Sequence, residues 1–270
     1  MKALDSHCHA DMLSKLSPDF IETYRTKQIG GITWSYNEQI VSFKHYPDYW
    51  DELQTLCEGW TQNGVIFFYL VGIHPRSIPP DLKGVRKLPP EITDAIMKHT
   101  ENPLCLGFGE LGMDSGTLEE EKIFRWQLEW AEDHLPKTKR IGIHTPRQNK
   151  EAMTERLLRL LEDYRPLHPF ILIDHVTPAT YDMVYGEGYV AGVTLQQGKS
   201  SPEDFIKIIE KYPKMVKAIL VNSDGAKELS QPYLEWIDKH EAFDEEQFKL
   251  LAVSNALTFF NVSLEEEESK

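Results

Sequence analysis

The sequence contains little cysteine and no long apolar segment. Its 270 residues include three cysteines, Cys8, Cys57 and Cys105, an odd number placed far apart. This distribution excludes a disulfide framework and is typical of reduced thiols in the cytoplasm, where we expect the protein to be located. No apolar run approaches the roughly 18 residues that a membrane span requires, and Met1-Lys2 leads directly into a predicted strand rather than a signal peptide. We therefore expect no membrane association.

Basic residues are also scarce relative to acidic ones. The chain has 29 Lys and Arg against 43 Asp and Glu, a net charge of −14 at pH 7. Such a chain repels phosphate backbones at long range unless its site is locally positive or binds cations. Repeats, low-complexity segments and linkers are missing. We expect one domain over residues 1–264, followed by a short, solvated acidic tail, Glu265–Lys270.

What the sequence does contain is a regular alternation of two patterns. Short runs rich in β-branched and aromatic residues are separated by longer stretches with helical periodicity. Most of the short runs are continuously apolar, which is typical of strands covered on both faces. The predicted strands are Lys2–Ser6, Gly31–Tyr36, Val65–Ile73, Leu104–Glu110, Arg140–His144, Phe170–His175, Gly188–Leu195 and Val216–Asp224. The predicted helices are Phe20–Gln28 (capped by Ser17), Glu38–Trp60, Pro90–His99, Leu118–His134 (capped by Thr117), Gln148–Tyr164, Pro178–Tyr185, Ser201–Lys211, Gln231–His240 and Glu245–Phe260.

Eight strands alternating with helices suit two parallel architectures, a closed barrel and an open doubly wound sheet. The strand count and the length favour the barrel, since single α/β barrels of about 250 residues are common. The first predicted strand is not followed by a glycine-rich dinucleotide turn, which argues against a Rossmann domain. The sequence therefore predicts an α/β protein with a single-domain (β/α)8 TIM barrel.

Two histidines follow the first predicted strand. His7 and His9 are two residues apart, and strand side chains alternate with a period of two, so both rings should point the same way. Both can then reach one ion, and a neutral imidazole is the commonest metal ligand in proteins. Cys8 lies between them, and we expect it to face the opposite side and to serve packing.

Other strand ends carry the same kinds of residue. In a barrel, the carboxyl ends of all strands meet at one face, where catalytic residues lie. Each such residue alone is typical of an ordinary loop, but a gathering of histidines and carboxylates at one face predicts a metal site. Besides His7 and His9, the residues at strand ends are His74, Glu110, His144, His175 and Asp224.

Histidine and carboxylate without cysteine suit a hard or borderline divalent ion, and we expect one or two ions of zinc, manganese or magnesium. Two ions about 3.5–4 Å apart can hold a hydroxide and clamp the attacking and leaving oxygens. Glu110 can bridge such ions. Asp224 can bind one of them, take a proton from water and return it to the leaving group. These two carboxylates are the predicted catalytic residues.

The same residues carry a resemblance to a known family. The chain resembles the TatD-related metal-dependent hydrolases of the amidohydrolase superfamily, and the resemblance spans the whole chain in the right order. Besides the strand-end His175 and Asp224, the matching motifs are LDSHCHADM at 4–12, GIHPR at 72–76, GFGELGMD at 107–114, IGIHTPR at 141–147 and SNALTFFNV at 254–262.

The resemblance implies a role for each residue. It assigns one metal to His7, His9 and Asp224, with Asp224 also the general base. It assigns the second metal to His144 and His175, and makes Glu110 the bridge. It further implies that His74 contacts the substrate rather than a metal, and that Asn255 of the last motif is structural.

Three loops depart from the family pattern. The family usually has Glu-Thr-Asp with a following proline at the last strand, where this chain has Asn222-Ser223-Asp224-Gly225-Ala226. An aromatic residue and a glycine usually follow the strand-six histidine, where this chain has Val176-Thr177-Pro178. An arginine usually stands two residues after the strand-five histidine, where this chain has Pro146 and then Arg147. The departures leave the ligand set intact and alter the loops that face the substrate.

Three functions are consistent with these residues. The first is a divalent-metal hydrolase acting on a small-molecule or nucleic-acid phosphoester, DNA 3′ ends included, with Arg76, Arg147 and Lys199 holding the phosphate. The second is a hydrolase of a small carboxylic ester, amide or lactone, which suits the acidic chain better. The third is a barrel that binds metal or ligand without catalysis. The sequence leaves open the metal's identity, the number of ions and the oligomeric state.

Overall fold

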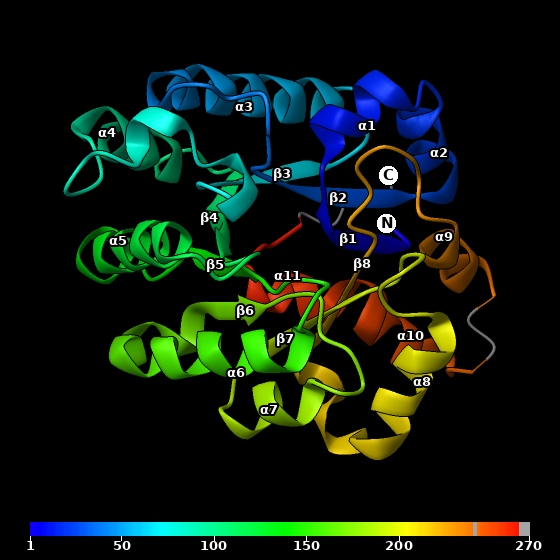
Figure 1. Ribbon diagram of the computed structural model, residues 1–270. Helices are drawn as coiled ribbons and strands as arrows, with labels where there is room; N and C mark the ends of the chain where they lie inside the picture. The colour runs from blue at the N-terminus through cyan, green and yellow to red at the C-terminus, as the bar shows by residue number, and fades with distance from the viewer. Residues whose placement is uncertain (240–241, 265–270) are drawn as a thin grey trace.

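Eight parallel strands form one sheet in which each strand pairs with the next one along the chain, from β1 to β8. The computed structural model describes residues 1–239 and 242–264, so the predicted acidic tail lies outside the described residues. The first and last strands meet near their carboxyl ends, where Asp224 N donates to His7 O at 2.9 Å and His9 N donates to Gly225 O at 2.7 Å. Helices surround the strands (Figure 1). The predicted (β/α)8 barrel is confirmed.

All eight predicted strands are present; β5 has the predicted ends, and the ends of the other seven are shifted. They are β1 (Ala3–Cys8), β2 (Ile29–Trp34), β3 (Phe67–Val71), β4 (Cys105–Gly112), β5 (Arg140–His144), β6 (Ile171–Ile173), β7 (Val190–Thr194) and β8 (Ile219–Asn222). The prediction for the eighth strand began too early, because Val216 lies in a 3₁₀ helix, Pro213–Ala218. Val216 is nevertheless buried, so the apolar run reports burial there rather than strand conformation.

The helices follow the strands in order. They are α1 (Ala10–Leu16), α2 (Phe20–Lys27), α3 (Tyr46–Gln62), α4 (Pro90–Thr100), α5 (Leu118–His134), α6 (Lys150–Leu161), α7 (Tyr181–Gly186), α8 (Pro202–Lys211), α9 (Gln231–Asp238), α10 (Glu245–Lys249) and α11 (Asn255–Phe259), the last two joined by a π-helical turn, Leu250–Ser254. Within residues 1–239 and 242–264, none of them has the length and apolar character that a membrane crossing requires.

Three helix predictions were wrong in detail. Helix α1 was missed because it is short and its N-cap, His9, provides no capping hydrogen bond that the sequence would signal. Helix α2 has Asp19 rather than Ser17 at its N-cap position, and no side chain makes a capping hydrogen bond there. Helix α3 begins at Tyr46 rather than Glu38, because the backbone before it is held by tertiary contacts. The Asn37 N–H, for example, donates to the Ser77 hydroxyl.

The core has two layers. One apolar cluster lies between the strands and the helices and contains Cys8, as predicted for a packing residue. The other fills the inside of the barrel and includes Leu4, Ile32, Trp34, Phe68, Leu70, Leu106, Leu172 and Leu220, with Ala256, Phe259 and Phe260 from the α11 region.

Helix α11 seals the amino ends of the strands. The Asn255 side-chain amide donates to Val216 O at 2.6 Å and to Ile219 O at 2.8 Å, at the start of β8. Arg140, the first residue of β5, lies over the Phe259 ring at 5.5 Å. These contacts fit the structural role expected of Asn255. The opposite, carboxyl end of the barrel is left for the polar residues.

Candidate metal centre

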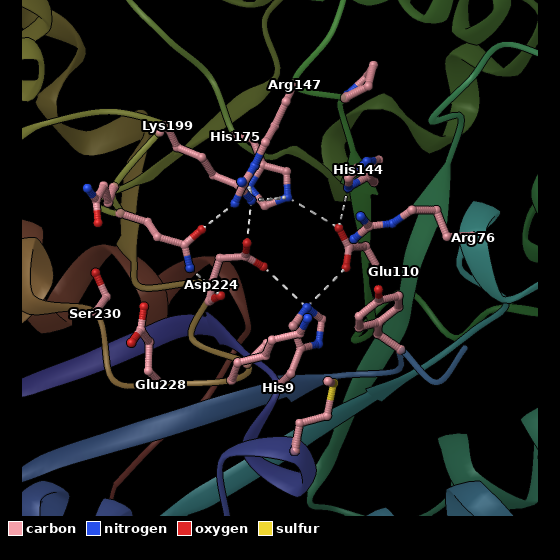
Figure 2. A pocket seen from close by; sticks show the side chains of 18 of the residues that line it. His9, Arg76, Glu110, His144, Arg147, His175, Lys199, Asp224, Glu228 and Ser230 are labelled. Atoms are coloured by element: carbon pink, nitrogen blue, oxygen red, sulfur yellow. Dashed lines mark hydrogen bonds and ion pairs between the residues drawn. The ribbon is translucent and has the colours of Figure 1, made fainter. Parts of the chain in front are cut away.

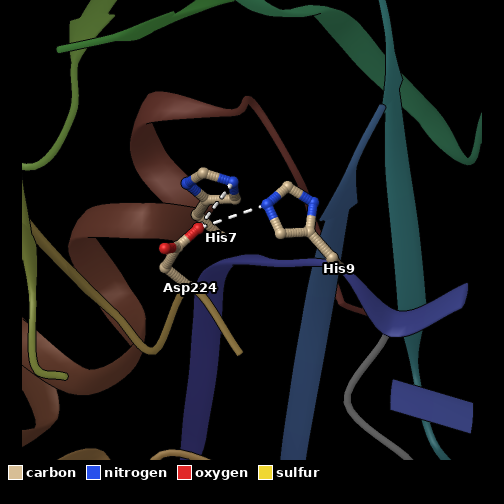
Figure 3. Close-up of side chains that lie close together, drawn as sticks. All are labelled: His7, His9 and Asp224. Carbon is tan, nitrogen blue, oxygen red and sulfur yellow. Dashed lines mark ion pairs between the residues drawn. The ribbon is translucent and has the colours of Figure 1, made fainter. Parts of the chain in front are cut away.

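The side chains that the sequence singled out meet at the carboxyl end of the barrel (Figure 2). His7 belongs to β1 and lies in one close group with His9 and Asp224 (Figure 3). Glu110, in β4, lies within reach of both His7 and His175. All of these side chains are buried except that of Asp224, which is 13% exposed. The predicted convergence of residues from the first ten positions to beyond position 220 is therefore observed.

An irregularity in β1 aims His7 at the barrel axis. The pairing of β1 with β2 shifts register between Asp5 and Cys8. Asp5 consequently accepts a hydrogen bond from the Tyr24 hydroxyl of α2 at 2.6 Å, whereas His7 stacks on Trp34 inside the barrel with ring centroids 4.0 Å apart. Gly142 makes room for Trp34, because a Cβ at that position would lie 2.3 Å from the indole ring. The alternation rule alone would not have placed Asp5 and His7 in different layers.

Two of the site residues have left-handed backbone conformations. The φ angle is +60° at His175 and +45° at Asp224, values that are uncommon for residues other than glycine. Such conformations cost free energy and cluster at functional sites. Because β6 ends at Ile173 and the chain turns at His175, both Asp174 and His175 face the interior. In a continuing strand these neighbours would point to opposite sides.

Four donor atoms surround one point. They are His7 Nε2, His9 Nε2, Glu110 Oε2 and Asp224 Oδ1. The His7 nitrogen lies 3.4 Å from the Glu110 oxygen and 3.6 Å from the Asp224 oxygen. The His9 nitrogen lies 3.7 Å and 3.2 Å from the same two atoms. Tetrahedral ligands about 2.0–2.1 Å from an ion are separated by roughly 3.3–3.4 Å, so these donors have the spacing of a four-coordinate site. We call them the first ligand group.

The protonation pattern of the first ligand group also suits an ion. His7 Nε2 and Glu110 Oε2 are buried, and neither has a hydrogen-bond partner within the described residues. Buried polar atoms are rarely left unpaired. His9 Nδ1 lies 3.0 Å from Trp34 O, and His7 Nδ1 lies 2.5 Å from Asp174 Oδ2. Since both partners are acceptors, each Nδ1 carries a hydrogen, and Nε2 is the atom that each ring would present to an ion. A divalent ion fits this donor set.

A second ligand group uses the other oxygen of Glu110. Glu110 Oε1 lies 2.7 Å from His144 Nδ1 and 3.3 Å from His175 Nε2. Glu110 therefore presents one oxygen to each group, which is the geometry expected of a bridging carboxylate. The second group has three donors, and the Lys199 ammonium lies beside it. That ammonium pairs with Asp224 Oδ2 and approaches the His175 ring nitrogens at 3.1 and 3.2 Å.

His74 lies near both groups but carries its proton toward them. Its Nε2 lies 3.6 Å from Glu110 Oε2. Its Nδ1 accepts a hydrogen bond from the Arg76 backbone N–H at 3.0 Å, so the ring hydrogen is on Nε2. Burial lowers the pKa of His74 well below its ordinary value, which keeps the ring neutral. His74 is thus a hydrogen-bond donor facing the site, in keeping with the expected contact to substrate.

The carboxylates of the cluster are ionised. Burial opposes ionisation, but the positive charge of His7 holds the pKa of Glu110 well below its usual range. For Asp224 burial is likewise outweighed, chiefly by the Lys199 ammonium, and its pKa is also well below its usual range. Burial disfavours a charged His7, yet the Glu110 charge and the Asp174 hydrogen bond raise its pKa to about 10. A divalent ion entering the first ligand group would displace this proton.

A pocket of about 1470 Å³ opens above the cluster, and all three predicted phosphate-binding cations line it. The Arg76 guanidinium lies 5.0 Å above the Tyr36 ring and 3.8 Å from Glu38 Oε1. Arg147 donates to Gln196 Oε1 at 2.7 Å. Both arginines lie at the rim. Lys199 instead lies deep, 8% exposed, against the metal-ligand candidates.

Two buried or half-buried carboxylates in contact with the ligands were not assigned from the sequence. Asp114 Oδ1 lies 3.0 Å from His144 Nε2, on the ring edge opposite Glu110. Asp174 binds the ring of His7. The position of Asp114 within GFGELGMD was an available signal. Asp174 gave none, because alternation along the predicted strand put it opposite His175.

The loop that carries Asp114 is held by a helix cap. Thr117 caps α5 as predicted, accepting from the Glu120 N–H at 3.2 Å. The Glu120 carboxylate accepts from the backbone N–H groups of Asp114, Ser115 and Gly116 at 2.9 Å. The turn between β4 and α5 is thereby tied down beside the second ligand group.

Known proteins share this fold and sequence pattern. A family profile described as "TatD related DNase" matches residues 4–246. A Methanocaldococcus jannaschii protein named as an uncharacterized metal-dependent hydrolase is 29% identical, covering 96% of this chain and 100% of the relative. The crystal structure of a TatD-like protein from Archaeoglobus fulgidus superposes with a TM-score of 0.71 at 25% identity, covering 96% of this chain and 100% of that chain.

A more distant neighbour shows the fold alone. The 5-carboxyvanillate decarboxylase of Sphingomonas paucimobilis has a TM-score of 0.61 at 10% identity, covering 97% of this chain and 98% of that chain. The family profile spans most of the chain. The chain belongs to the TatD-related DNase family and is a metal-dependent hydrolase.

Proposed function

We propose that this protein hydrolyses a phosphoester with one or two divalent ions bound by the two ligand groups. The observation that carries the proposal is the first ligand group. Two of its buried atoms, His7 Nε2 and Glu110 Oε2, have no hydrogen-bond partner in the described part of the chain, and they lie at metal-ligand spacing from Asp224 and His9. His144 and His175 would hold the second ion, with Glu110 as the bridge. An ion bound there would acidify a water molecule and polarise the ester.

Asp224 is the proposed general base. Its Oδ1 belongs to the first ligand group, while its Oδ2 faces Lys199 at the floor of the pocket. The ion pair with Lys199 keeps the carboxylate ionised and lowers its basicity. Asp224 would therefore accept the proton of a water molecule whose own pKa the bound ion has lowered. The same proton then passes to the leaving oxygen as the P–O bond breaks, which balances the reaction without another acid.

Three side chains would hold the phosphoryl group. The hydrogen of His74 is on Nε2, 3.6 Å from Glu110 Oε2, and Arg76 and Arg147 line the pocket. A guanidinium binds phosphate oxygens through paired hydrogen bonds, and its charge persists at every physiological pH. The arginines come from the segments that follow β3 and β5, the strands on either side of β4, which carries Glu110.

The direct test is turnover by metal-reconstituted protein. We expect hydrolysis of bis(p-nitrophenyl) phosphate, p-nitrophenyl phosphate or 3′-ended DNA with added zinc, manganese or magnesium. His9→Ala should abolish it, whereas His45→Ala, in the 3₁₀ helix before α3 and outside the pocket lining, should not. Absence of any turnover that requires both metal and His9 would eliminate the phosphoester version.

A second candidate substrate class is a small carboxylic ester, amide or lactone. Its support is the charge of the pocket rim, because Asp19, Glu38, Asp114 and Glu228 line the same pocket as the arginines. Together with a net charge of −14, this rim repels a long polyanion. Salt separates the classes, because the affinity for DNA falls steeply with rising salt whereas that for a neutral ester does not.

A further inference from the structure

A chain of buried hydrogen bonds links the two ligand groups beneath the pocket. It consists of Asp174, which follows β6, Thr194 at the end of β7, and Asn222 at the end of β8. All three are 0% exposed, and none lines the pocket. At one end the chain reaches His7 of the first ligand group, and at the other it reaches His175 of the second.

The direction of every bond in this chain follows from Asp174. Its ionised carboxylate only accepts, so the amide nitrogen of Asn222 must face it, and Nδ2 donates to Asp174 Oδ1 at 2.8 Å. The amide oxygen of Asn222 then faces Thr194, whose hydroxyl donates to it at 2.8 Å. With its hydrogen committed, Thr194 Oγ1 accepts from His175 Nδ1 at 2.7 Å. The hydrogen of His175 is therefore on Nδ1, and its lone pair is on Nε2.

The same carboxylate orients the other histidine. Asp174 Oδ2 lies 2.5 Å from His7 Nδ1 and accepts its hydrogen, while Oδ1 also accepts from the His175 backbone N–H at 2.7 Å. One carboxylate thus determines which nitrogen faces the ions in both ligand groups.

The barrel is shaped to admit Asp174. A Cβ at Gly192, in β7, would lie 2.1 Å from Asp174 Oδ1 and 2.8 Å from its Cγ. Only glycine leaves room for the carboxylate at this point of the wall. Asn222, the partner of Asp174, also stands at a position where the chain departs from the usual family pattern.

We infer that Asp174, relayed through Asn222 and Thr194, is the positioning residue that presents His7 Nε2 and His175 Nε2 to the two metal ions. The inference rests on the ligand roles proposed above. Outer partners of this kind typically change metal affinity by about 10- to 100-fold when they are removed.

Replacing Asp174 by Asn keeps the size of the side chain, removes its negative charge and replaces one acceptor oxygen by an NH₂ donor. If the new amide oxygen faces His7, its NH₂ group meets the Asn222 amide and the His175 backbone N–H, donor against donor. If it faces the other way, its NH₂ group meets His7 Nδ1 and moves the ring hydrogen to Nε2, where an ion would bind. We therefore expect zinc affinity at both positions to fall by about 10- to 100-fold in Asp174→Asn.

Two further variants separate positioning from packing. Thr194→Val should weaken only the position that includes His175, because His7 keeps its bond to Asp174. The double variant Asp174→Asn, Asn222→Asp moves the carboxylate one step along the hydrogen-bond chain, lets the new amide oxygen at position 174 accept from His7, and should recover part of the lost affinity. Thr154→Val is the matched control, since the buried Thr154 hydroxyl in α6 has no hydrogen-bond partner within the described residues.

The experiment is zinc titration of the full chain with metal analysis, together with long-range ¹H–¹⁵N spectra of the zinc-loaded protein. We expect Nδ1–H signals from His7 and His175 in the wild type, and their loss or shift in Asp174→Asn. Unchanged zinc affinity and histidine spectra in Asp174→Asn would overturn the inference. So would an Nε2–H form of His175 in the wild type, with Lys199 bound at Nδ1.

These readouts are independent of turnover. A wild type that binds zinc with the expected histidine spectra but cleaves no phosphoester refutes the proposed substrate and leaves the positioning role intact. A wild type that binds none of zinc, manganese and magnesium refutes both. Circular dichroism of each variant checks folding, and Thr194→Val still tests the relay if Asp174→Asn does not fold.

Discussion

The two ends of the barrel are built from the same eight strands and have opposite chemistry. At the amino end, Phe259 and Phe260 pack with Leu4, Phe68 and other apolar side chains inside the barrel. At the carboxyl end, the buried side chains are ionisable, and two of their polar atoms have no partner within the described residues.

This difference shows that the amino end of the barrel stabilises the fold and that the carboxyl end destabilises it. Burying the aromatic plug releases water from apolar surface and stabilises the barrel. Burying carboxylates and imidazoles without an ion is costly, because their desolvation is incompletely compensated. Substitutions at the two ends should therefore separate stability from activity.

The largest effect is expected at the carboxyl end, on activity. Asp224→Ala removes both a first-group ligand atom and the proposed general base. We expect kcat/KM to fall by at least about 10³-fold, equivalent to about 4 kcal/mol of transition-state stabilisation. Thermal unfolding of the metal-free protein should change little.

Asp182→Asn is the matched control and should retain activity. Asp182 lies on α7 and forms an exposed ion pair with Lys211 of α8. An Asp224→Ala enzyme of normal activity would show that the general base lies elsewhere.

The next effect is expected at the amino end, on stability. Phe259→Ala should lower the free energy of unfolding by about 3 kcal/mol, because it leaves a cavity beneath the barrel. Zinc affinity and kcat/KM of the folded variant should match those of the wild type. Leu118→Ala, at a side chain that is 82% exposed, should change stability by less than about 0.5 kcal/mol. Urea denaturation measures both, and lost zinc binding in folded Phe259→Ala would contradict the separation of the two ends.

Metal removal should lower the thermal stability of any variant that still binds the ion, whichever end of the barrel carries the substitution. An ion that binds only the native chain stabilises it by about 2.7 kcal/mol at a concentration of 100 times its Kd. We expect chelation to lower the Tm of the wild type and of Phe259→Ala by similar amounts. Asp224→Ala should show a much smaller shift. Scanning calorimetry with and without zinc tests this, and an equal shift in all three proteins would place the ion outside the first ligand group.

The smallest effect is expected at the pocket rim. Arg76→Ala should lower kcat/KM for an anionic phosphoester by about tenfold, or about 1.4 kcal/mol, mostly through KM. Arg86→Ala, at an exposed position outside the pocket lining, should have no effect. Steady-state kinetics at low and high salt would show the loss, and an unchanged KM in Arg76→Ala would remove that residue from substrate binding.

The sequence by itself determined the barrel and its chemical end. The alternation of short apolar runs with periodic helices depends on local spacing, and so does the placement of histidines and carboxylates after strands. Parallel strands in a closed barrel must bring those ends together, which is why His7, Glu110 and Asp224 could be grouped from sequence. The Thr117 cap of α5 was predictable for the same reason, since capping joins residues a few positions apart.

Only the tertiary structure decided how the site is finished. The register shift in β1, the left-handed turn at His175 and the space above Gly192 all arise from packing between distant segments. They turn Asp174 inward, although alternation along the predicted strand put it opposite His175. The tertiary structure also shows that Glu110 offers one oxygen to each ligand group and that Lys199 pairs with Asp224. Sequence spacing specifies which end of a strand a residue occupies, but its side-chain direction and partner depend on the neighbours that the closed barrel supplies.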